Sequence, residues 1–435
     1  MASNPDELNQ YVTAVLVAHD GATWITEVVA ALTSQSRKID RLIAIDTDSK
    51  DESAKKLRSA GITTLSMSRG TGFGDAIDEA LRKLPSKNSE TVTEWIWLIH
   101  DDSAPAKSAL AELLTAIENR PTVAIAGPKI KGWHDRNHLL EIGVSIAGNG
   151  ARWTGLEYRE QDQGQRDGIK DELAVSTAGA LIRRDVYEEL GGLDPNLSLF
   201  RDDVDFGWRA RVAGHSVIVA TDAVGYHAQA AASERRTVDV KGALLHRPLL
   251  LDRRNAAYVL LANASIWALP MLSLQLLAGA IFRSVGYLFA KLPGYASDEL
   301  LAILTLIIHP TEILAARKAR KKSRFISSAA VKPFIPSRFQ QIRSSMARAI
   351  DALRERVIPD REETVVNSAL EINEDEDLLT PSSQRSWLLL FTRPIIAMAS
   401  ALVVITLLWS RHRLGAISGG ALAMAPESAQ ELFKL

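Results

Sequence analysis

The sequence predicts an α/β fold built on a mostly parallel sheet, followed by a helical and hydrophobic C-terminal region. Between residues 12 and 222, short apolar runs alternate with amphipathic segments of helical length, which indicates βαβ units. The runs are continuously apolar, as is typical of strands buried on both faces. The expected strands cover residues 12–18, 42–45, 63–67, 95–99 and 123–126, and the expected helices cover 24–33, 53–60, 75–84 and 107–118.

Composition excludes several classes of protein. The chain has 435 residues, a net charge of −1 and no cysteine. This length suggests two or three structural units. A net charge near zero gives no indication of nucleic-acid binding, and the lack of cysteine excludes disulfides and thiolate metal sites. The N-terminus is polar and acidic, without the basic and apolar stretches of a signal peptide, so we expect the first domain to stay in the cytosol.

Three hydrophobic segments follow the α/β region, at residues 256–282, 300–308 and 387–409. A helix needs about 20 apolar residues to cross a bilayer, so the first and third segments are long enough. For the first we favour a membrane or in-plane helix over a buried soluble helix, and for the third a true span. The basic cluster at 317–322 indicates a cytosolic or lipid-facing stretch, or simply a solvated helix end. The topology stays open.

These patterns divide the chain into five parts. We expect an α/β domain at 1–245, a hydrophobic or amphipathic, membrane-associated helical region at 246–322 and a polar linker at 323–385. A transmembrane helix at 386–410 and a C-terminal tail at 411–435 follow, and the sequence is compatible with the front part of a longer multi-span protein.

Polar side chains follow the expected strands, where ligands bind in open α/β sheets. Carboxylates gather after two of these strands, and such a gathering is costly unless a cation or a positive partner is present. The residues that follow the first four strands are His19, Asp20 and Gly21; Asp46, Thr47, Asp48, Ser49 and Asp51; Arg69, Gly70, Gly72 and Gly74; and His100, Asp101, Asp102 and Ser103.

Two acidic motifs are candidates for chemistry. Asp101 and Asp102 lie on a tight loop before Pro105, where they suit a hard cation such as Mg²⁺ or Mn²⁺, or cap the next helix. Asp202 and Asp203 open a helix, where they are either caps or acceptors of a proton from a hydroxyl.

A lone histidine is a third candidate. His227 follows the apolar run 217–220. Such a residue is more often structural than a metal ligand, so the pattern alone leaves both interpretations open.

Taken together, residues 12–227 resemble the family 2 glycosyltransferases, which have the GT-A fold, the Rossmann-like mixed sheet of nucleotide-diphospho-sugar transferases. The resemblance covers about half of the chain and depends on the order and spacing of several motifs. The similar segments are 15–21 (the first strand and loop), 46–51 (Asp-Thr-Asp-Ser-Lys-Asp), 69–78 (Arg-Gly-Thr-Gly-Phe-Gly-Asp-Ala-Ile-Asp), 101–103 (Asp-Asp-Ser), 177–185, 191–194 and 202–205. Thr47, Arg69 and Asp78 stand where the family has Asn, and Ser103 stands at its last acidic position.

The resemblance implies a role for each matching residue. It makes 1–245 a catalytic domain with Asp203 as general base and Asp202 beside it. The implied ligands of an Mg²⁺ or Mn²⁺ ion are Asp101, Asp102 and His227. The implied nucleotide-sugar contacts are Asp20, Asp46, Asp48, Asp51, Gly72 and Asp101.

The implied reaction is an inverting sugar transfer from a nucleotide-diphospho sugar. The hydrophobic segments suggest a lipid-linked or cell-envelope glycan acceptor, and an enzyme at the cell membrane with a cytoplasmic catalytic domain. A nucleotidyltransferase would need a Gly-rich, basic loop after the first strand, where the chain has His19-Asp-Gly-Ala-Thr23. A Rossmann dehydrogenase is a weaker rival, because the glycines at 70, 72 and 74 have the wrong spacing and position. A catalytically inactive scaffold of an envelope-glycan complex is the alternative from another class.

Overall fold

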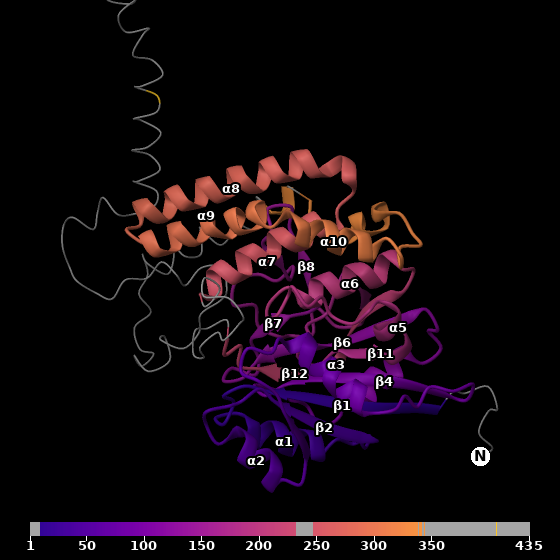
Figure 1. Cartoon of the computed structure of the whole chain (residues 1–435). Helices are drawn as coiled ribbons and strands as arrows, with labels where there is room; N and C mark the ends of the chain where they lie inside the picture. Colours follow the sequence, from indigo (N-terminus) through magenta and orange to yellow (C-terminus); the bar gives the residue numbers. More distant parts are fainter. Residues whose placement is uncertain (1–8, 232–246, 338, 342, 344–405, 407–435) are drawn as a thin grey trace, which may run out of the picture.

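A mixed sheet with helices on both faces forms one part of the molecule, and a layer of helices covers one end of it (Figure 1). The structure is a computed structural model and describes residues 9–231, 247–337, 339–341, 343 and 406. The expected transmembrane helix and tail, apart from residue 406, and most of the expected linker lie outside the described residues. The fold prediction of a mixed α/β sheet followed by helices is confirmed.

The first half of the sheet is parallel, as predicted, and its strands are β1 (Asn9–Ala18), β2 (Arg41–Asp46), β3 (Thr63–Ser66) and β4 (Val92–His100). They lie in the order β3-β2-β1-β4 and are joined by α1 (Ile25–Thr33), α2 (Ser53–Ser59) and α3 (Phe73–Lys83). Ala18 pairs with Asp46, and Val17 pairs with His100. The carboxyl ends of β1, β2 and β4 therefore meet at one edge.

The second half makes the sheet mixed. β11 (Leu181–Arg183) lies antiparallel between β4 and β6 (Val123–Gly132), and β12 (Ser216–His227) runs parallel to β6. Short antiparallel strands are added at β5 (Ser103–Pro105), β7 (Leu139–Glu141) and β10 (Ile169–Asp171), while β8 (Ser145–Ile146) pairs with β9 (Arg152–Trp153). β5 pairs with the end of β12, which brings the segment after β4 to the last strand.

Two apolar cores explain why the strands are continuously apolar. Val15 and Val17 of β1 face one core, while Ala14 and Leu16 face the other. The first core is covered by α3, α5 (Arg184–Glu189) and α6 (Asp202–Val212), and the second by α1, α2 and α4 (Ala109–Ile117). Burying both faces of each strand holds the strand ends, and with them the loops, in fixed positions.

A third core joins the sheet domain to the helical layer, whose members are α7 (Pro248–Asn263), η1 (Ile266–Ala268), α8 (Leu269–Phe289), α9 (Pro293–Ile308), α10 (Pro310–Arg320) and η2 (Ser328–Phe334). This core contains Trp208 of α6 and Tyr258 of α7, both buried. α7 thus lies between α6 and the outer helices α8 and α9 (Figure 1).

The hydrophobic segment 256–282 is divided between two helices of different character. Its first part belongs to buried α7, and its second part belongs to α8, whose outer residues are exposed. The helical structure is interrupted at residues 264–265, between α7 and η1, and Pro270 lies in the first turn of α8, where its missing N–H costs nothing. By length and composition, Ile266–Phe289 is the helix among the described residues that is able to cross a membrane, and α9 and α10 form a pair bent by 67°.

Candidate active site

The loops after β1 and β2 are fastened to each other by hydrogen bonds. Asp20 has a φ of 51°, and its carboxylate accepts a hydrogen bond from the Lys50 N–H at 2.6 Å and pairs with Arg69. Burial raises the pKa of Asp20, but the hydrogen bonds from Arg69 and Lys50 outweigh burial and lower it below the usual value. Arg69, which departs from the family motif, therefore has a partner in this loop.

The acids after β2 have different environments. Asp46 is 4% exposed, and its Oδ1 has no hydrogen-bond partner within the described part of the chain. Asp48 is exposed and pairs with Lys50 at 2.7 Å. Asp51 accepts hydrogen bonds from the N–H groups of Ala22 at 2.8 Å and Ser53 at 2.9 Å. Asp46 is thus buried at the strand end with acceptor capacity left, whereas the carboxylate of Asp51 is used within the loops.

Two further residues of the motifs are explained by close packing. Gly72 precedes α3, and a Cβ built there would lie 3.0 Å from Cα of Ser198. The Phe73 N–H donates to the Ser198 carbonyl at 3.0 Å, so glycine lets this loop approach. Thr47 lies with its Oγ1 2.7 Å from Nδ1 of His19. Both positions link neighbouring loops at the carboxyl edge of the sheet.

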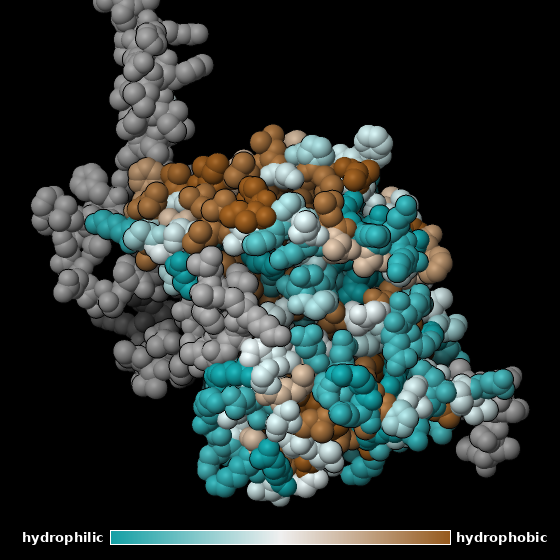
Figure 2. Space-filling model, in the orientation of Figure 1, coloured by the Kyte–Doolittle hydropathy of each residue, from teal (hydrophilic) through white to brown (hydrophobic). Residues whose placement is uncertain are grey.

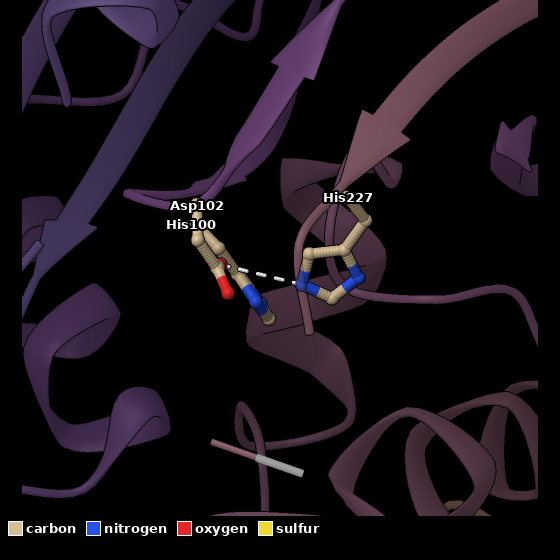
Figure 3. A group of neighbouring side chains, drawn as sticks. All are labelled: His100, Asp102 and His227. Carbon is tan, nitrogen blue, oxygen red and sulfur yellow. Dashed lines mark ion pairs between the residues drawn. The ribbon is translucent and has the colours of Figure 1, made fainter. Parts of the chain in front are cut away.

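His100, Asp102 and His227 form a cluster at this edge (Figure 3). One candidate ligand atom from each residue lies within 4.8 Å of the others. The pairing of β5 with β12 brings them together, since His227 pairs with Ser103 and the Ala228 N–H donates to the Asp102 carbonyl at 3.0 Å. Nε2 of His227 lies 3.3 Å from Oδ1 of Asp102. The cluster therefore depends on strand pairing between distant parts of the chain.

Asp101 is not a member of this cluster. Its Oδ2 accepts a hydrogen bond from the His19 N–H at 2.7 Å, and a Cβ on Gly21 would lie 2.2 Å from the same oxygen. Asp102 and His227 thus lie together in the cluster. Its third member is His100, and not Asp101, which was expected as a ligand. The sequence pattern did not indicate His100 as a ligand. His100 ends β4, and a turn at residues 101–102 brings Asp102 beside it, a geometry that strand periodicity does not predict.

The donor set of the cluster fits a divalent transition metal. Two imidazole nitrogens and a carboxylate oxygen suit Mn²⁺ better than Mg²⁺, which prefers oxygen ligands. Nε2 of His100 lies 3.1 Å from Oγ1 of Thr177, and the Ala230 N–H donates to Oδ2 of Asp102 at 2.8 Å. Such contacts orient ligand side chains.

A pair of acids opens α6. Oδ2 of Asp203 accepts a hydrogen bond from Nη2 of Arg152 at 2.6 Å, and Arg152 also pairs with Glu141 at 2.9 Å. Burial and the neighbouring Asp203 raise the pKa of Asp202 to about 7. The two acids thus have different environments although they are adjacent. The sequence motif indicated both acids, but no local pattern connects Arg152 with them.

Other acids of the motifs support the fold. Asp205 is fully buried and pairs with Arg209 of its own helix and with Arg320 of α10, at 2.8 Å each. Arg320 also pairs with Asp194 at 2.5 Å. Asp78 accepts a hydrogen bond from the Tyr187 hydroxyl at 2.7 Å, which explains an acid where the family has Asn.

Known proteins similar to this chain include members of one enzyme family. The family described as "Glycosyltransferase like family 2" matches residues 9–241. Galactofuranosyltransferase GlfT1 of Mycolicibacterium smegmatis is 25% identical over 198 residues, which cover 45% of this chain and 64% of the relative. GlfT1 of Mycobacterium tuberculosis is 25% identical over 226 residues, 51% of this chain and 71% of the relative.

Among solved structures, the mannosyltransferase PcManGT from Pyrobaculum calidifontis, in complex with GDP-Man and Mn²⁺, aligns with a TM-score of 0.40 and 16% identity. This alignment covers 83% of this chain and 90% of that one. The match to the M. smegmatis protein spans less than two thirds of that relative's length. The family match covers more than half of the 435 residues. The chain therefore belongs to glycosyltransferase family 2.

Proposed function

We propose that this chain is an inverting glycosyltransferase that moves a sugar from a nucleotide-diphospho sugar to an acceptor hydroxyl. The observation that carries the proposal is the cluster of His100, Asp102 and His227 at the carboxyl edge of the sheet, in a chain of family 2. Loops from three strands meet beside it, as expected for a ligand site in an open α/β sheet.

The donor would lie between the metal cluster and the loops after β1 and β2. Asp46 is the best-supported nucleoside contact, because its Oδ1 is buried without a hydrogen-bond partner in the described part of the chain. Asp20, Asp48, Asp51, Gly72 and Asp101 complete the proposed donor contacts. Two relatives named galactofuranosyltransferase make galactofuranose the first donor sugar to test.

His100, Asp102 and His227 would hold a divalent cation, and their donor set favours Mn²⁺ over Mg²⁺. Asp101, expected as a ligand from the sequence, would instead support the donor loop through the His19 N–H. A cation bound there would offset the charge of the leaving diphosphate. Thr177 would fix the ring of His100, and the Ala230 N–H would fix the carboxylate of Asp102.

Asp203 is the proposed general base. Its carboxylate takes the proton of the acceptor hydroxyl, whose oxygen forms a bond to the anomeric carbon. The bond from that carbon to the diphosphate breaks on the opposite face, so configuration is inverted. Arg152 orients Asp203, and Asp202, whose pKa is raised to about 7, allows the pair to hold a proton near neutral pH.

The acceptor is proposed to be a lipid-linked or cell-envelope glycan, used by an enzyme at the cell membrane with its catalytic domain in the cytoplasm. Support comes from the helix at Ile266–Phe289, which is long and apolar enough to interact with a membrane. Its exposed apolar residues lie on the same helical layer that packs against α6.

A nucleotide titration tests the donor site. UDP, GDP and dTDP are added to the full chain with and without Mn²⁺, and thermal unfolding is followed. A ligand that binds the folded state at about a hundredfold excess over its Kd adds about 2.7 kcal/mol of stability. We expect one nucleotide to stabilise the chain in a Mn²⁺-dependent manner. Asp102→Asn should abolish this shift, while Asp185→Asn, on α5, should keep it.

Turnover separates the transferase from its rivals. We expect sugar transfer that Asp203→Asn abolishes while the nucleotide-dependent stabilisation remains. A scaffold would bind without turnover, or would be indifferent to Asp203→Asn. A nucleotidyltransferase would instead release pyrophosphate from a nucleoside triphosphate. No stabilisation with any of the three nucleotides would contradict the proposal.

A further inference from the structure

The outer face of the helical layer carries a continuous band of apolar side chains (Figure 2). We call this band the outer face; it consists of Trp267, Met271, Leu274, Phe282, Val285 and Phe289 on η1 and α8, and Leu300, Leu304 and Ile307 on α9. Phe282 is 72% exposed and Trp267 is 90% exposed. Within each helix these residues are three, four or eight positions apart, which places them on one side of the helix. A band of this size indicates an interaction surface.

The opposite side of α8 packs against the layer beneath it through Leu276 and through polar side chains. Arg283 pairs with Glu299 of α9 at 2.9 Å, and Glu299 is fully buried. Arg253 of α7 pairs with the same Glu299 at 3.0 Å. The Ser284 hydroxyl donates to the Ala296 carbonyl at 2.8 Å. One side of α8 therefore packs against the protein, and the other side is apolar and exposed.

This two-sidedness argues against α8 as a spanning helix. A helix that crosses a bilayer alone is surrounded by hydrocarbon, so Arg283 would leave Glu299 and enter the apolar core. Glu299 would keep only Arg253 as a partner. A helix that lies along the surface keeps these ion pairs and buries only its apolar side.

The charges around the outer face fit an anionic surface. The acids between residues 264 and 325 are Asp298, Glu299 and Glu312, and each pairs with an arginine. The exposed charges are basic, with Lys291 at the turn between α8 and α9, and with Lys318, Lys321 and Lys322 at the end of α10. Anionic lipid headgroups attract such residues, whereas a second copy of the chain would bring the same positive charges against them.

We propose that the outer face docks onto an anionic lipid bilayer, with α8 lying in the plane of the membrane instead of crossing it. The inference rests on the membrane location proposed above and specifies the mode of attachment. The apolar side chains would reach about 5–10 Å below the headgroups. Because α7 separates α6 from the outer helices, the acid pair of α6 would lie one helical layer away from the lipid.

Depth measurements on single labels test this mode. The chain has no cysteine, so one introduced cysteine carries the only label. Leu274→Cys, Phe282→Cys and Phe289→Cys place a nitroxide along α8. Lys55→Cys, at an exposed position of α2, is the control. The full chain is reconstituted in phosphatidylcholine–phosphatidylglycerol vesicles. Collision with oxygen and with a water-soluble nickel complex then gives the depth of each label.

We expect the three α8 labels to lie at the same shallow depth and the control label to stay in water. A crossing helix, which rises about 1.5 Å per residue, would carry the labels through about 22 Å of depth. Such a gradient would overturn the proposal, and so would α8 labels exposed to the nickel complex. The readout needs no turnover, so a failed transferase assay and a failed docking mode are distinguishable. Thermal unfolding of each variant checks that the fold is intact.

Discussion

The adjacent carboxylates of Asp101 and Asp102, after β4, contact different groups. Asp102 faces His100 and His227, and Asp101 accepts a hydrogen bond from the His19 N–H. Both acids are buried, at 1% and 4% exposure, so each needs the partners that its own side supplies. Adjacent residues with the same chemistry therefore have separable roles.

Isosteric changes at these two positions separate the roles. Asp102→Asn should weaken Mn²⁺ binding by about 100-fold, because an amide is a poorer ligand than a carboxylate. Asp101→Asn should change Mn²⁺ affinity less than about 3-fold while lowering thermal stability, because the amide oxygen is a weaker acceptor for the His19 N–H. Electron paramagnetic resonance of free Mn²⁺ during titration measures both affinities. Equal losses in the two variants would show that both carboxylates face the ion.

Glu172 links stability to pH through burial. Burial raises the pKa of Glu172 to about 7, against the opposing effect of Lys170 and Arg211. The folded state thus keeps a proton that the unfolded chain has released, so this stability contribution is full below a pH of about 4.5 and is lost as pH rises through about 7.

Glu172→Gln removes that titration. Between about pH 5 and about pH 8, the free energy of unfolding of the variant should fall by about 1 kcal/mol less than that of the parent, since partial solvation reduces the full linkage value. Urea unfolding at several pH values measures the difference. Glu118→Gln, at the exposed end of α4, is the control and should leave the pH dependence of the parent unchanged. Parallel pH profiles for Glu172→Gln and the parent would contradict the prediction.

At the scale of elements, the buried parallel strands were predictable and the short antiparallel strands were not. β1, β2 and β4 show continuous apolar runs, because both faces of each of these strands are buried. β3, at the edge of the sheet, has the sequence Thr-Thr-Leu-Ser and no buried residue. β5, β10 and β11 have three residues each and form by pairing with distant strands. Hydrophobicity also predicted one segment at 256–282, because the interruption at residues 264–265 does not change the hydrophobicity of the sequence.

The buried Glu299 of α9 offers a test of how the helical layer is held. Glu299→Ala leaves Arg253 and Arg283 without their shared carboxylate and should cost about 3 kcal/mol of stability. Glu312→Ala removes a pair with Arg254 whose carboxylate is 34% exposed, and should cost less than about 1 kcal/mol. Chemical unfolding gives both values, and limited proteolysis shows whether α8 and α9 become accessible. Similar costs for the two variants would mean that burial does not set the strength of these pairs.

At the scale of the whole molecule, the sequence predicted the edge of the site but not all of its members. The carboxyl ends of parallel strands lie at the same edge of a sheet, so the acids after β2 and β4 were expected at that edge. Arg152 meets Asp203 across 51 residues, and His100 meets His227 through the pairing of β5 with β12. Such contacts follow from tertiary packing, which a local pattern does not contain.

The helical layer also holds the loop that presents the acid pair of α6. Phe200 and Arg201 have φ values of 63° and 67°, which are unfavourable for residues with a side chain. The Arg201 guanidinium donates two hydrogen bonds to the carboxylate of Asp252 of α7, at 2.6 and 2.9 Å. The Asn255 side chain of α7 donates a hydrogen bond to the Leu199 carbonyl at 2.7 Å. The position of Asp203 therefore depends on α7.

Asp252→Asn should weaken this support without touching the metal cluster. We expect kcat to fall by about 10-fold, equivalent to about 1.4 kcal/mol of transition-state stabilisation, because Asp203 loses its orientation toward the acceptor. The Kd of the nucleotide with Mn²⁺ should stay within about 2-fold of the parent, since the donor loops lie on other elements. Steady-state transfer assays and the nucleotide titration measure the two quantities. Glu312→Gln, which removes a carboxylate paired with Arg254 of α7, is the control. An unchanged kcat would show that the loop keeps its conformation without α7, and a parallel loss of nucleotide affinity would indicate general unfolding instead of positioning.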